Sequence, residues 1–308
     1  MLLAFDVGQT RSRVRVRKAG SVLFAGETDG FRYGTSLEEQ IIRVVGYVRA
    51  QLPDAELEVV AGGSTGLNGR VPALPDLGRR LAATAGVRRL YLADDVVTAH
   101  LGAFGGGPGV LAAVGTGLVA VALGPDALAR VDGAGPLLGD NGAGWWIGRE
   151  GIIAALSAWD GRSGGSADLL DRLQRHFGPA ADVPRMIAES TEPFSTVASF
   201  AIEVAAAARE ADPVARRIWR DAAHQIANAI CAAAARAGAG PAFAWCLVGR
   251  IGRAADLLEP TMSSTVREAF PDARAVTAVG TALDGAERLP DAYATLRTSA
   301  LVAEYHHE

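Results

Sequence analysis

Three acidic residues stand where apolar segments end, and they are the first candidates for chemistry. Asp6 closes the run that begins at Leu2, and Asp94 and Asp95 follow the run "LYLA". If these runs are strands of an open α/β sheet, a carboxylate at each C-terminal end faces the ligand-binding crevice. Asp6 could then hold Mg²⁺ or one of its waters, and Asp94 or Asp95 could orient or deprotonate a substrate hydroxyl in phosphoryl transfer. The structural alternatives are that Asp6 bonds turn amides and that the pair only caps a helix.

The turn after Asp6 carries the first candidate phosphate ligands. Beyond it, Arg and Val alternate with the period of a strand, so "DVGQTRSR" predicts a β-hairpin and not the helix-opening turn of a dinucleotide fold. A glycine turn of this kind can present backbone N–H groups to a phosphate. The candidates in it are Gly8, Gln9, Thr10 and Arg11. The other arginines of the second strand are expected to form a solvated face: Arg13, Arg15 and Arg17.

A second glycine turn repeats this device. The stretch "AAVGTGLVAVAL" places Gly115, Thr116 and Gly117 between two apolar strands. One such turn is common, and by itself the first turn is explained better as an ordinary hairpin. Two turns in corresponding places of a repeated strand-turn-strand unit favour a pair of clamps around a polyphosphate.

The most glycine-rich segment, "DGAGPLLGDNGAGWWIG", leads into an aromatic, helix-type pattern. Asp140 and Asn141 lie just before that pattern. The Asp140 carboxylate could cap the helix, bind a ligand or do both, and the sequence leaves these alternatives open.

Strands and helices alternate in an order that would position these residues. The predicted strands are residues 2–7, 13–17, 21–26, 57–61, 89–93, 110–114, 118–123, 128–131 and 243–248. Helices are expected after a capping box at Ser36 and Glu39, over 74–85 and 96–103, through most of 144–237, and over about 280–299. This mixture predicts α/β layers. Because the strand pattern restarts after "GGGPG", a candidate hinge, we expect one domain of residues 1–105, a second of 106–285, and a C-terminal segment, about 286–308, that completes the first.

Composition narrows the class of protein. The 308 residues, 49% of them apolar, suffice for two domains with cores of their own. A formal net charge of −4 argues against a dedicated nucleic-acid binder, and no apolar run has the length of a membrane span. Cys231 and Cys246 lack the spacing of a metal site or a disulfide framework. We expect a cytoplasmic protein without a signal peptide that acts on a small molecule.

Taken together and in order, five segments resemble a known family. They are "FDVGQTRSR", "LADDV", "AVGTG", "GPLLGDNGAGWWIG" and "LVGRIGRAADLL". They resemble the BadF/BadG/BcrA/BcrD-type ATPases and, within that family, N-acetylglucosamine kinases of the sugar kinase, Hsp70 and actin superfamily. The resemblance implies two ribonuclease-H-like domains with ATP and Mg²⁺ in the cleft between them. Relatives are often homodimers, so a homodimer is expected.

The resemblance also implies roles for individual residues. Asp95 would be the catalytic base for a sugar hydroxyl, and "DVGQTRS" and "GTG" would be the two phosphate loops. Adenosine would lie at Gly249, Arg250 and Gly252. The sugar would contact Asp140, Asn141 and the turn "GGSTGLNG", which offers Ser64, Thr65 and Gly66, with Asn68 as a further hydrogen-bonding candidate.

The chain departs from the family pattern where the sugar is concerned. Asn141 stands in place of a common glutamate, Leu118 in place of a small polar residue, and Arg250 in place of the second of two glycines. The loop Asp29–Ser36 lacks the asparagine signature associated with N-acetylglucosamine. We therefore predict an ATP-dependent sugar kinase with an amino sugar as the expected acceptor, and leave the sugar and its hydroxyl open. The alternatives are an ATPase that activates a partner enzyme and a non-catalytic sugar sensor.

Overall fold

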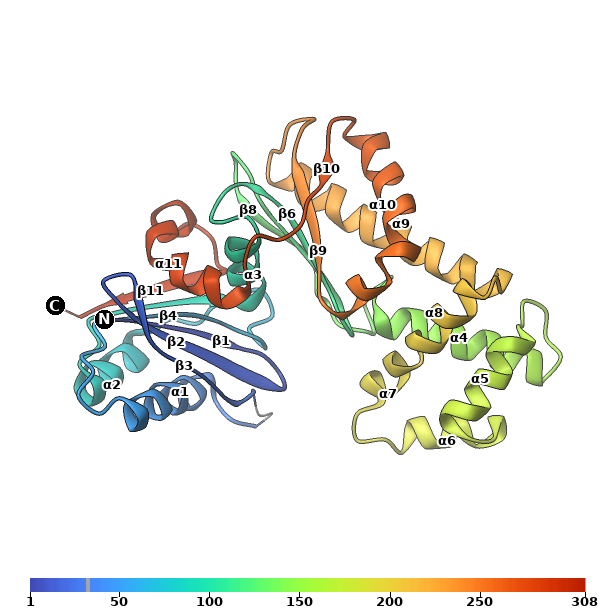
Figure 1. The fold of residues 1–308 in the computed structure, drawn as a ribbon, viewed down its shortest axis with the longest axis horizontal. Helices are drawn as coiled ribbons and strands as arrows, with labels where there is room; N and C mark the ends of the chain where they lie inside the picture. The colour runs from blue at the N-terminus through green and yellow to red at the C-terminus, as the bar shows by residue number, and fades with distance from the viewer. Residues whose placement is uncertain (32–33, 308) are drawn as a thin grey trace. The chain divides into compact units, whose positions relative to one another are not determined.

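The structure, a computed structural model, describes residues 1–31 and 34–307 (Figure 1). The loop 29–36, considered above for sugar recognition, lies partly outside these residues. The chain divides into two compact units: unit 1 is Met1–Gly109 with Thr277–Glu308, and unit 2 is Val110–Val276. Each unit has its own sheet and its own hydrophobic core. The domain limits expected after residues 105 and 285 remain predictions.

Unit 1 is built on a six-stranded sheet with the order β11-β5-β4-β1-β2-β3. Its strands are β1 (Leu2–Val7), β2 (Arg11–Lys18), β3 (Ser21–Asp29), β4 (Val59–Ser64), β5 (Arg89–Asp94) and β11 (Val302–His306). β1, β2 and β3 form an antiparallel meander, so the predicted hairpin after Asp6 is confirmed. β4 and β5 run parallel to β1, and the C-terminal ends of these three strands therefore meet at one edge of the sheet.

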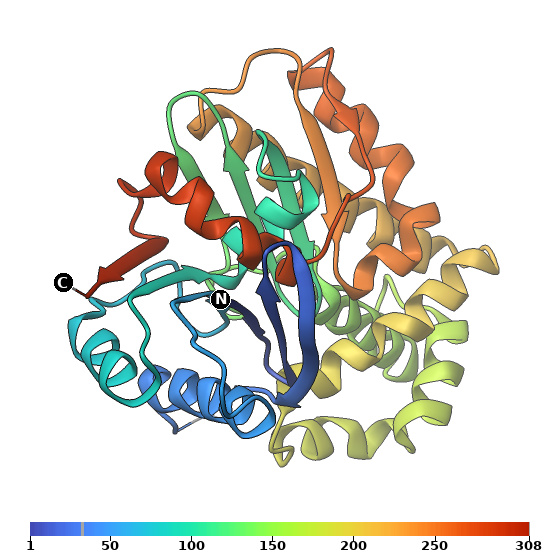
Figure 2. The same ribbon diagram turned by 60° about the vertical axis from the view of Figure 1, so that its left-hand side comes forward.

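Helices cover both faces of this sheet. They are α1 (Leu37–Gln51), α2 (Pro75–Ala85), α3 (Asp95–Ala103) and α11 (Ala282–Leu296). α1 and α2 bury their apolar sides against Leu3 and Phe5 of β1. Because side chains alternate along a strand, Ala4 points to the opposite face, where it packs with Leu283 and Ala286 of α11. α3 lies beside α11 on that face (Figures 1 and 2).

Local signals set the helix ends of unit 1. The Ser36 hydroxyl accepts a hydrogen bond from the Glu39 amide, and the Glu39 carboxylate accepts one from the Ser36 amide. The predicted capping box at the start of α1 is therefore confirmed. α2 begins at Pro75 and ends at Gly86, whose φ of 69° is the left-handed conformation that glycine adopts without strain.

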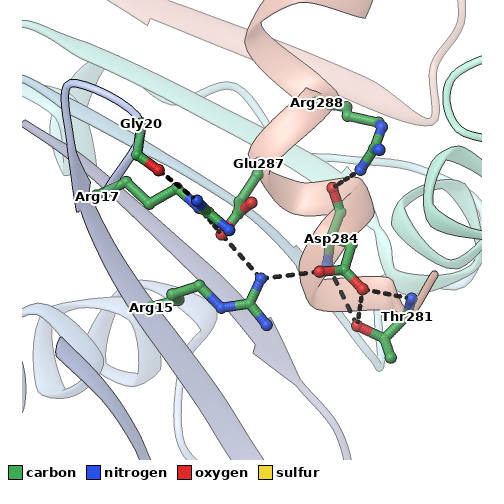
Figure 3. A network of polar contacts seen from close by, with 7 residues as sticks. All are labelled: Arg15, Arg17, Gly20, Thr281, Asp284, Glu287 and Arg288. Atoms are coloured by element: carbon green, nitrogen blue, oxygen red, sulfur yellow. Dashed lines mark hydrogen bonds and ion pairs between the residues drawn. The ribbon is translucent and has the colours of Figure 1, made fainter. Parts of the chain in front are cut away.

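The arginine face of β2 is not the solvated face that the sequence predicts. Arg15 Nη1 lies 2.8 Å from Asp284 Oδ1 and 3.0 Å from Glu287 Oε1, and Arg17 Nε lies 2.8 Å from the same Glu287 oxygen (Figure 3). α11 supplies both carboxylates, so these two arginines anchor the C-terminal helix on β2. The prediction holds for Arg13, whose side chain is 56% exposed.

The C-terminal segment forms a strand, β11, that is not among those predicted from the sequence. β11 pairs antiparallel with β5, from Val302 opposite Ala93 to His306 opposite Arg89. The edge strand β5, whose backbone groups on that side have no other strand as partner among the described residues, takes up this segment. The His307 amide extends the pairing with a hydrogen bond to the Arg88 carbonyl.

Unit 2 is built on a five-stranded sheet with the order β10-β9-β6-β7-β8. Its strands are β6 (Gly109–Val114), β7 (Leu118–Leu123), β8 (Leu128–Asp132), β9 (Ala244–Val248) and β10 (Arg274–Ala275). Its helices are α4 (Gly144–Trp159), α5 (Ala167–Phe177), α6 (Val183–Ala188), α7 (Pro193–Ser199), α8 (Ala201–Arg209), α9 (Pro213–Arg236) and α10 (Ala255–Ala269), with short 3₁₀ turns η1 (Ala180–Asp182) and η2 (Arg250–Ala254).

The long helix α9 is rich in alanine and packs against several neighbouring elements. It contacts β7, β8, α10 and α4. Ala222, Ala223 and Ala227 on its packed side are fully buried, and such small side chains let a helix approach its neighbours closely. The two-sheet α/β architecture predicted from the sequence is thus confirmed. Within the described ranges, we find no helix with the length and apolarity needed to cross a lipid bilayer.

Candidate active site

Unit 1 gathers its candidate residues at the C-terminal edge of β1, β4 and β5. In the register of these strands, Asp6 pairs with Gly63 and Ser64 pairs with Asp94. The Thr65 amide donates to the Val7 carbonyl at 2.9 Å, which ties the end of β4 to the end of β1. The parallel pairing thus brings Asp6, Ser64, Thr65 and the Asp94-Asp95 pair to one place, as expected for a ligand site on an α/β sheet.

The two adjacent aspartates have different tasks. Asp94 is the N-cap of α3, and its carboxylate accepts a hydrogen bond from the Val96 amide at 3.4 Å. Asp94 is 4% exposed, whereas Asp95, the first residue of the helix, keeps part of its surface accessible. The capping alternative therefore applies to Asp94 and not to Asp95.

The electrostatics of the edge single out Asp95. The pKa of its carboxyl is raised from 3.8 to about 7. Burial is the main cause, and the charge of Asp94, a hydrogen bond with Asp94 and the charge of Asp6 add to it. A hydrogen bond with the Thr65 side chain acts in the opposite direction. A carboxyl group that titrates near neutral pH at the end of a strand is suited to accept a proton from a substrate hydroxyl.

Glycines of β4 allow this edge to be so compact. A Cβ at Gly63 would lie 2.2 Å from the Thr98 hydroxyl oxygen and 3.1 Å from the Asp95 Cα. Thr98 in turn donates from its hydroxyl to the Asp95 carbonyl at 2.9 Å. The start of α3 therefore lies against the end of β4 only because position 63 carries no side chain.

Asp6 is the candidate for holding a cation. Burial raises the pKa of its carboxyl, and Arg13, whose Nη1 lies 3.7 Å from Asp6 Oδ2, lowers it. Over residues 1–31 and 34–307, no group of three or more His, Cys, Asp or Glu side chains could enclose a metal ion. Mg²⁺ commonly keeps several waters and is held by one or two carboxylates together with substrate phosphates. The Asp6 carboxylate is a ligand of that kind.

The first glycine turn is closed by its own backbone. The Gly8 amide donates to the Arg11 carbonyl at 3.0 Å, and the Gly8 carbonyl accepts from the Phe31 amide at 2.8 Å. The Gly8 N–H is thus already used, and a phosphate would have to bind through other groups of the turn. Gln9 and Thr10 are exposed there, and the Arg11 side chain, 67% exposed, is paired with Glu27 at 2.8 Å.

The second glycine turn, in unit 2, is fixed from two sides. Its Gly115 and Thr116 carbonyls accept hydrogen bonds from the Gly144 and Trp145 amides at 2.9 and 3.0 Å, at the start of α4. Behind it, Asp140 Oδ1 accepts from the Leu118 amide at 2.9 Å. A Cβ at Gly117 would lie 2.6 Å from the Asp140 carboxylate, so glycine is needed there.

Asp140 therefore does not cap α4. The N-cap of that helix is Ala143, without a side-chain hydrogen bond. The Asp140 carboxylate is turned back to the glycine turn, and the residue is 7% exposed. Burial raises its pKa, and the bond from Leu118 lowers it. Asn141, next to it, is exposed.

Asp132 belongs to this arrangement and is absent from the sequence-based candidates. Both of its carboxylate oxygens accept from the Asp140 amide, at 3.1 and 3.2 Å, and one also accepts from Ala134. Asp132 and Asp140 both have left-handed backbone conformations, with φ of 61° and 60°. The signal that could have found Asp132 is its place at the end of a strand and directly before Gly133, a typical turn pair.

The proposed adenosine turn lies beside the second glycine turn. β9 runs parallel to β6, so the turns that follow these two strands are neighbours. Arg250 Nη2 donates to the Thr116 hydroxyl at 3.2 Å, and Gly252 closes the turn with a bond to the Gly249 carbonyl. A Cβ at Gly249, where φ is 99°, would lie 2.3 Å from the Val114 carbonyl oxygen. Unit 2 thus brings together Gly115–Gly117, Asp140 and Gly249–Gly252, and unit 1 brings together Asp6, Ser64, Thr65 and Asp95.

Comparison with solved structures supports the same kind of fold. A candidate N-acetylglucosamine kinase from Chromobacterium violaceum has 27% sequence identity and a TM-score of 0.71, over 92% of this chain and 96% of that one. A candidate N-acetylglucosamine kinase from Porphyromonas gingivalis has 19% identity and a TM-score of 0.68, over 96% and 99%. A ROK family glucokinase from Streptomyces griseus, in complex with glucose and AMPPNP, has 16% identity and a TM-score of 0.55, over 97% and 99%.

These structures share the actin-like ATPase fold of two ribonuclease-H-like domains, which is the fold class predicted from the sequence. None of the curated proteins compared with the chain matches it. The model of one family matches residues 6–286, which is most of the sequence and includes every site segment described above. The chain belongs to the BadF/BadG/BcrA/BcrD ATPase family.

Proposed function

We propose that this protein is an ATP-dependent kinase that phosphorylates a hydroxyl group of an amino sugar of the N-acetylglucosamine or glucosamine type. The observation that carries the proposal is the Asp95 carboxyl, which lies at the end of a parallel strand and has a pKa raised to about 7. The sequence identity of 27% with a candidate N-acetylglucosamine kinase supports the choice of acceptor. Membership in a family of ATPases supports ATP as the donor.

In this mechanism Asp95 accepts the proton of the attacking hydroxyl. The hydroxyl oxygen bonds to the γ-phosphorus, the bond from that phosphorus to the β,γ-bridging oxygen breaks, and ADP leaves. Ser64, Thr65 and Gly66 would hold the sugar by hydrogen bonds beside Asp95, as would Asp140 and Asn141. Since Asp140 is already bonded to Leu118, we assign it mainly to the support of the second phosphate turn.

The nucleotide would be held by the two glycine turns and the turn after β9. Gln9, Thr10 and Arg11 supply donors from the first turn, Thr116 from the second, and Gly249–Gly252 would line the adenosine. Mg²⁺, with Asp6 as its protein ligand, would neutralise charge on the phosphates when it is bound. We further expect a homodimer in the cytoplasm, as stated from the sequence.

The test is a coupled assay of ADP release over a panel of sugars and amino sugars, each with ATP and Mg²⁺. We expect turnover that depends on the sugar and is highest with N-acetylglucosamine or glucosamine. ATP hydrolysis at the same rate with and without every sugar would overturn the proposal and favour the activating-ATPase alternative. The absence of both transfer and hydrolysis would favour the non-catalytic sugar sensor.

A further inference from the structure

Asp94 is more than a helix cap, because its carboxylate has a second bond. Besides the bond from the Val96 amide, Asp94 Oδ2 accepts from the Gly69 amide at 3.0 Å. Gly69 lies at the end of the polar turn that contains the candidate sugar ligands Thr65 and Gly66. One buried carboxylate thus joins the start of α3 to that turn.

The turn needs such a tie, since its backbone is unusual. Gly66, Asn68 and Gly69 have φ of 83°, 50° and 80°, all in the left-handed region. For Asn68 this conformation has an energetic cost, which neighbouring interactions must offset. Among the described side chains, Asp94 bonds to this turn from outside it. The same turn carries Thr65, whose side chain hydrogen-bonds to Asp95.

The bonds to Asp94 also give the two aspartates different surroundings. Backbone N–H groups that donate to a carboxylate stabilise its charged form. Asp94 has two such donors, whereas Asp95 is buried beside Asp94 without a comparable pair. When two carboxyls share a proton, their environments separate their roles. Asp94 is therefore held by the backbone on both oxygens, and Asp95 is the carboxyl without such donors.

We propose that Asp94 is a positioning residue: through its bonds to the Gly69 and Val96 amides it holds the turn of residues 65–69 against α3 and so fixes the surroundings of Asp95. The proposal rests on the proposed function only in taking Asp95 as the group that meets the substrate. The contacts that carry it belong to unit 1 and need no nucleotide.

Further charged and polar groups surround Asp95. From β1, Asp6 acts on Asp95 in the same direction as Asp94, and Arg13 of β2 faces Asp6. From β4, the Thr65 side chain acts in the opposite direction. α11 packs on α3 near Gly102 and Thr98, and its Asp284 and Glu287 are paired with Arg15 of β2. Asp94 is the charged neighbour with the largest effect on Asp95.

The test is the titration of Asp carboxyl carbons by NMR in the ¹³C-labelled full chain, with Asp95→Asn used to assign the Asp95 signal. In the native chain we expect the Asp95 signal to titrate near pH 7. In Asp94→Asn the Asp95 midpoint should fall by about one pH unit or more, because a neighbouring negative charge is lost. Asp76→Asn removes the same charge from an exposed site in α2 and should leave the midpoint unchanged.

Two results would overturn the proposal: an Asp95 midpoint that does not move in Asp94→Asn, or a native Asp95 signal that does not titrate near pH 7. The second measurement does not need Asp94→Asn, so it decides the matter even if that variant does not fold. In the kinase assay, Asp94→Asn should move the acid limb of the kcat profile to lower pH and raise the sugar KM. If no sugar is phosphorylated by the native chain, the proposed function fails, and the NMR titration still tests the role of Asp94.

Discussion

Each unit has a pair of aspartates at its candidate site, Asp94 with Asp95 in unit 1 and Asp132 with Asp140 in unit 2, and the two pairs are used differently. Asp94 and Asp95 are adjacent, and only Asp94 is occupied by backbone amides. In unit 2 both acids are occupied, because Asp132 accepts from the Asp140 amide and Asp140 accepts from the Leu118 amide. A carboxylate bonded by backbone amides supports a turn, and the carboxyl left over is available for chemistry. Of these two pairs, the pair in unit 1 contains a carboxyl without backbone donors, that of Asp95.

The largest effect is expected when the carboxyl without backbone donors, Asp95, is removed. We expect Asp95→Asn to lower kcat by about 10²- to 10⁴-fold, the usual contribution of a general base. ATP affinity, measured by calorimetry, should change little because Asp95 does not contact the nucleotide in the proposed mechanism. Asp76→Asn serves as the control for charge and should keep full activity. Turnover of Asp95→Asn within a few fold of the native rate would remove Asp95 from the role of base.

Asp95→Asn, which is expected to lower activity, should increase the stability of the fold, by an amount that depends on pH. The folded-state pKa of Asp95, about 7, is above the unfolded value of 3.8, so the folded chain binds the extra proton between these pH values. Stability contributed by this group is present below about pH 4 and is lost as pH rises through 7. The free energy of unfolding of Asp95→Asn, taken relative to that of the native chain, should therefore rise by on the order of 3 kcal/mol as pH increases from 4 to 8. Urea unfolding of both proteins at pH 4 and pH 8 measures this change. If the difference between variant and native chain were the same at both pH values, the site would not disfavour the charged form of the Asp95 carboxyl.

Removal of an occupied carboxylate should have a different result. Asp140→Ala leaves the buried Leu118 amide without its acceptor, at a cost of about 2 kcal/mol. We expect faster hydrogen exchange of the Leu118 amide and weaker ATP binding, with no shift of the pH–rate profile. Asp140→Asn, which keeps an acceptor, should lose much less. If Asp140→Ala shifted the pH profile as Asp94→Asn is expected to do, the two pairs would not differ in the way described.

How far the sequence predicts these roles depends on the range of the interactions. The hairpin after Asp6, the capping box at Ser36 and the glycine turns follow from neighbouring residues, and these predictions agree with the structure. Which of Asp94 and Asp95 caps α3 depends on where the helix begins to within one residue, and a pattern does not resolve that. The bond from Leu118 to Asp140 spans 22 residues and needs left-handed backbone at two aspartates. Arg15 meets Asp284 across 269 residues, so its partner could not be inferred from the strand alone.

The ion pair of Arg15 and Asp284 offers the test with the smallest expected effect. Here the pKa of the carboxyl is lowered, whereas that of Asp95 is raised. Burial raises the pKa of Asp284, but hydrogen bonds from Arg15 and Thr281 outweigh it and lower the pKa to about 2 (Figure 3). Its contribution is present above pH 4 and is lost as pH falls towards 2. Asp284→Asn keeps an acceptor for Thr281 and should cost about 1 kcal/mol at pH 7 and almost nothing at pH 2. Arg11→Gln, at an exposed pair on the same strand, is the control and should cost less. If Asp284→Asn lowered the free energy of unfolding equally at both pH values, Asp284 would stabilise the helix anchor through packing. Its charge would then have no part in the difference from Asp95.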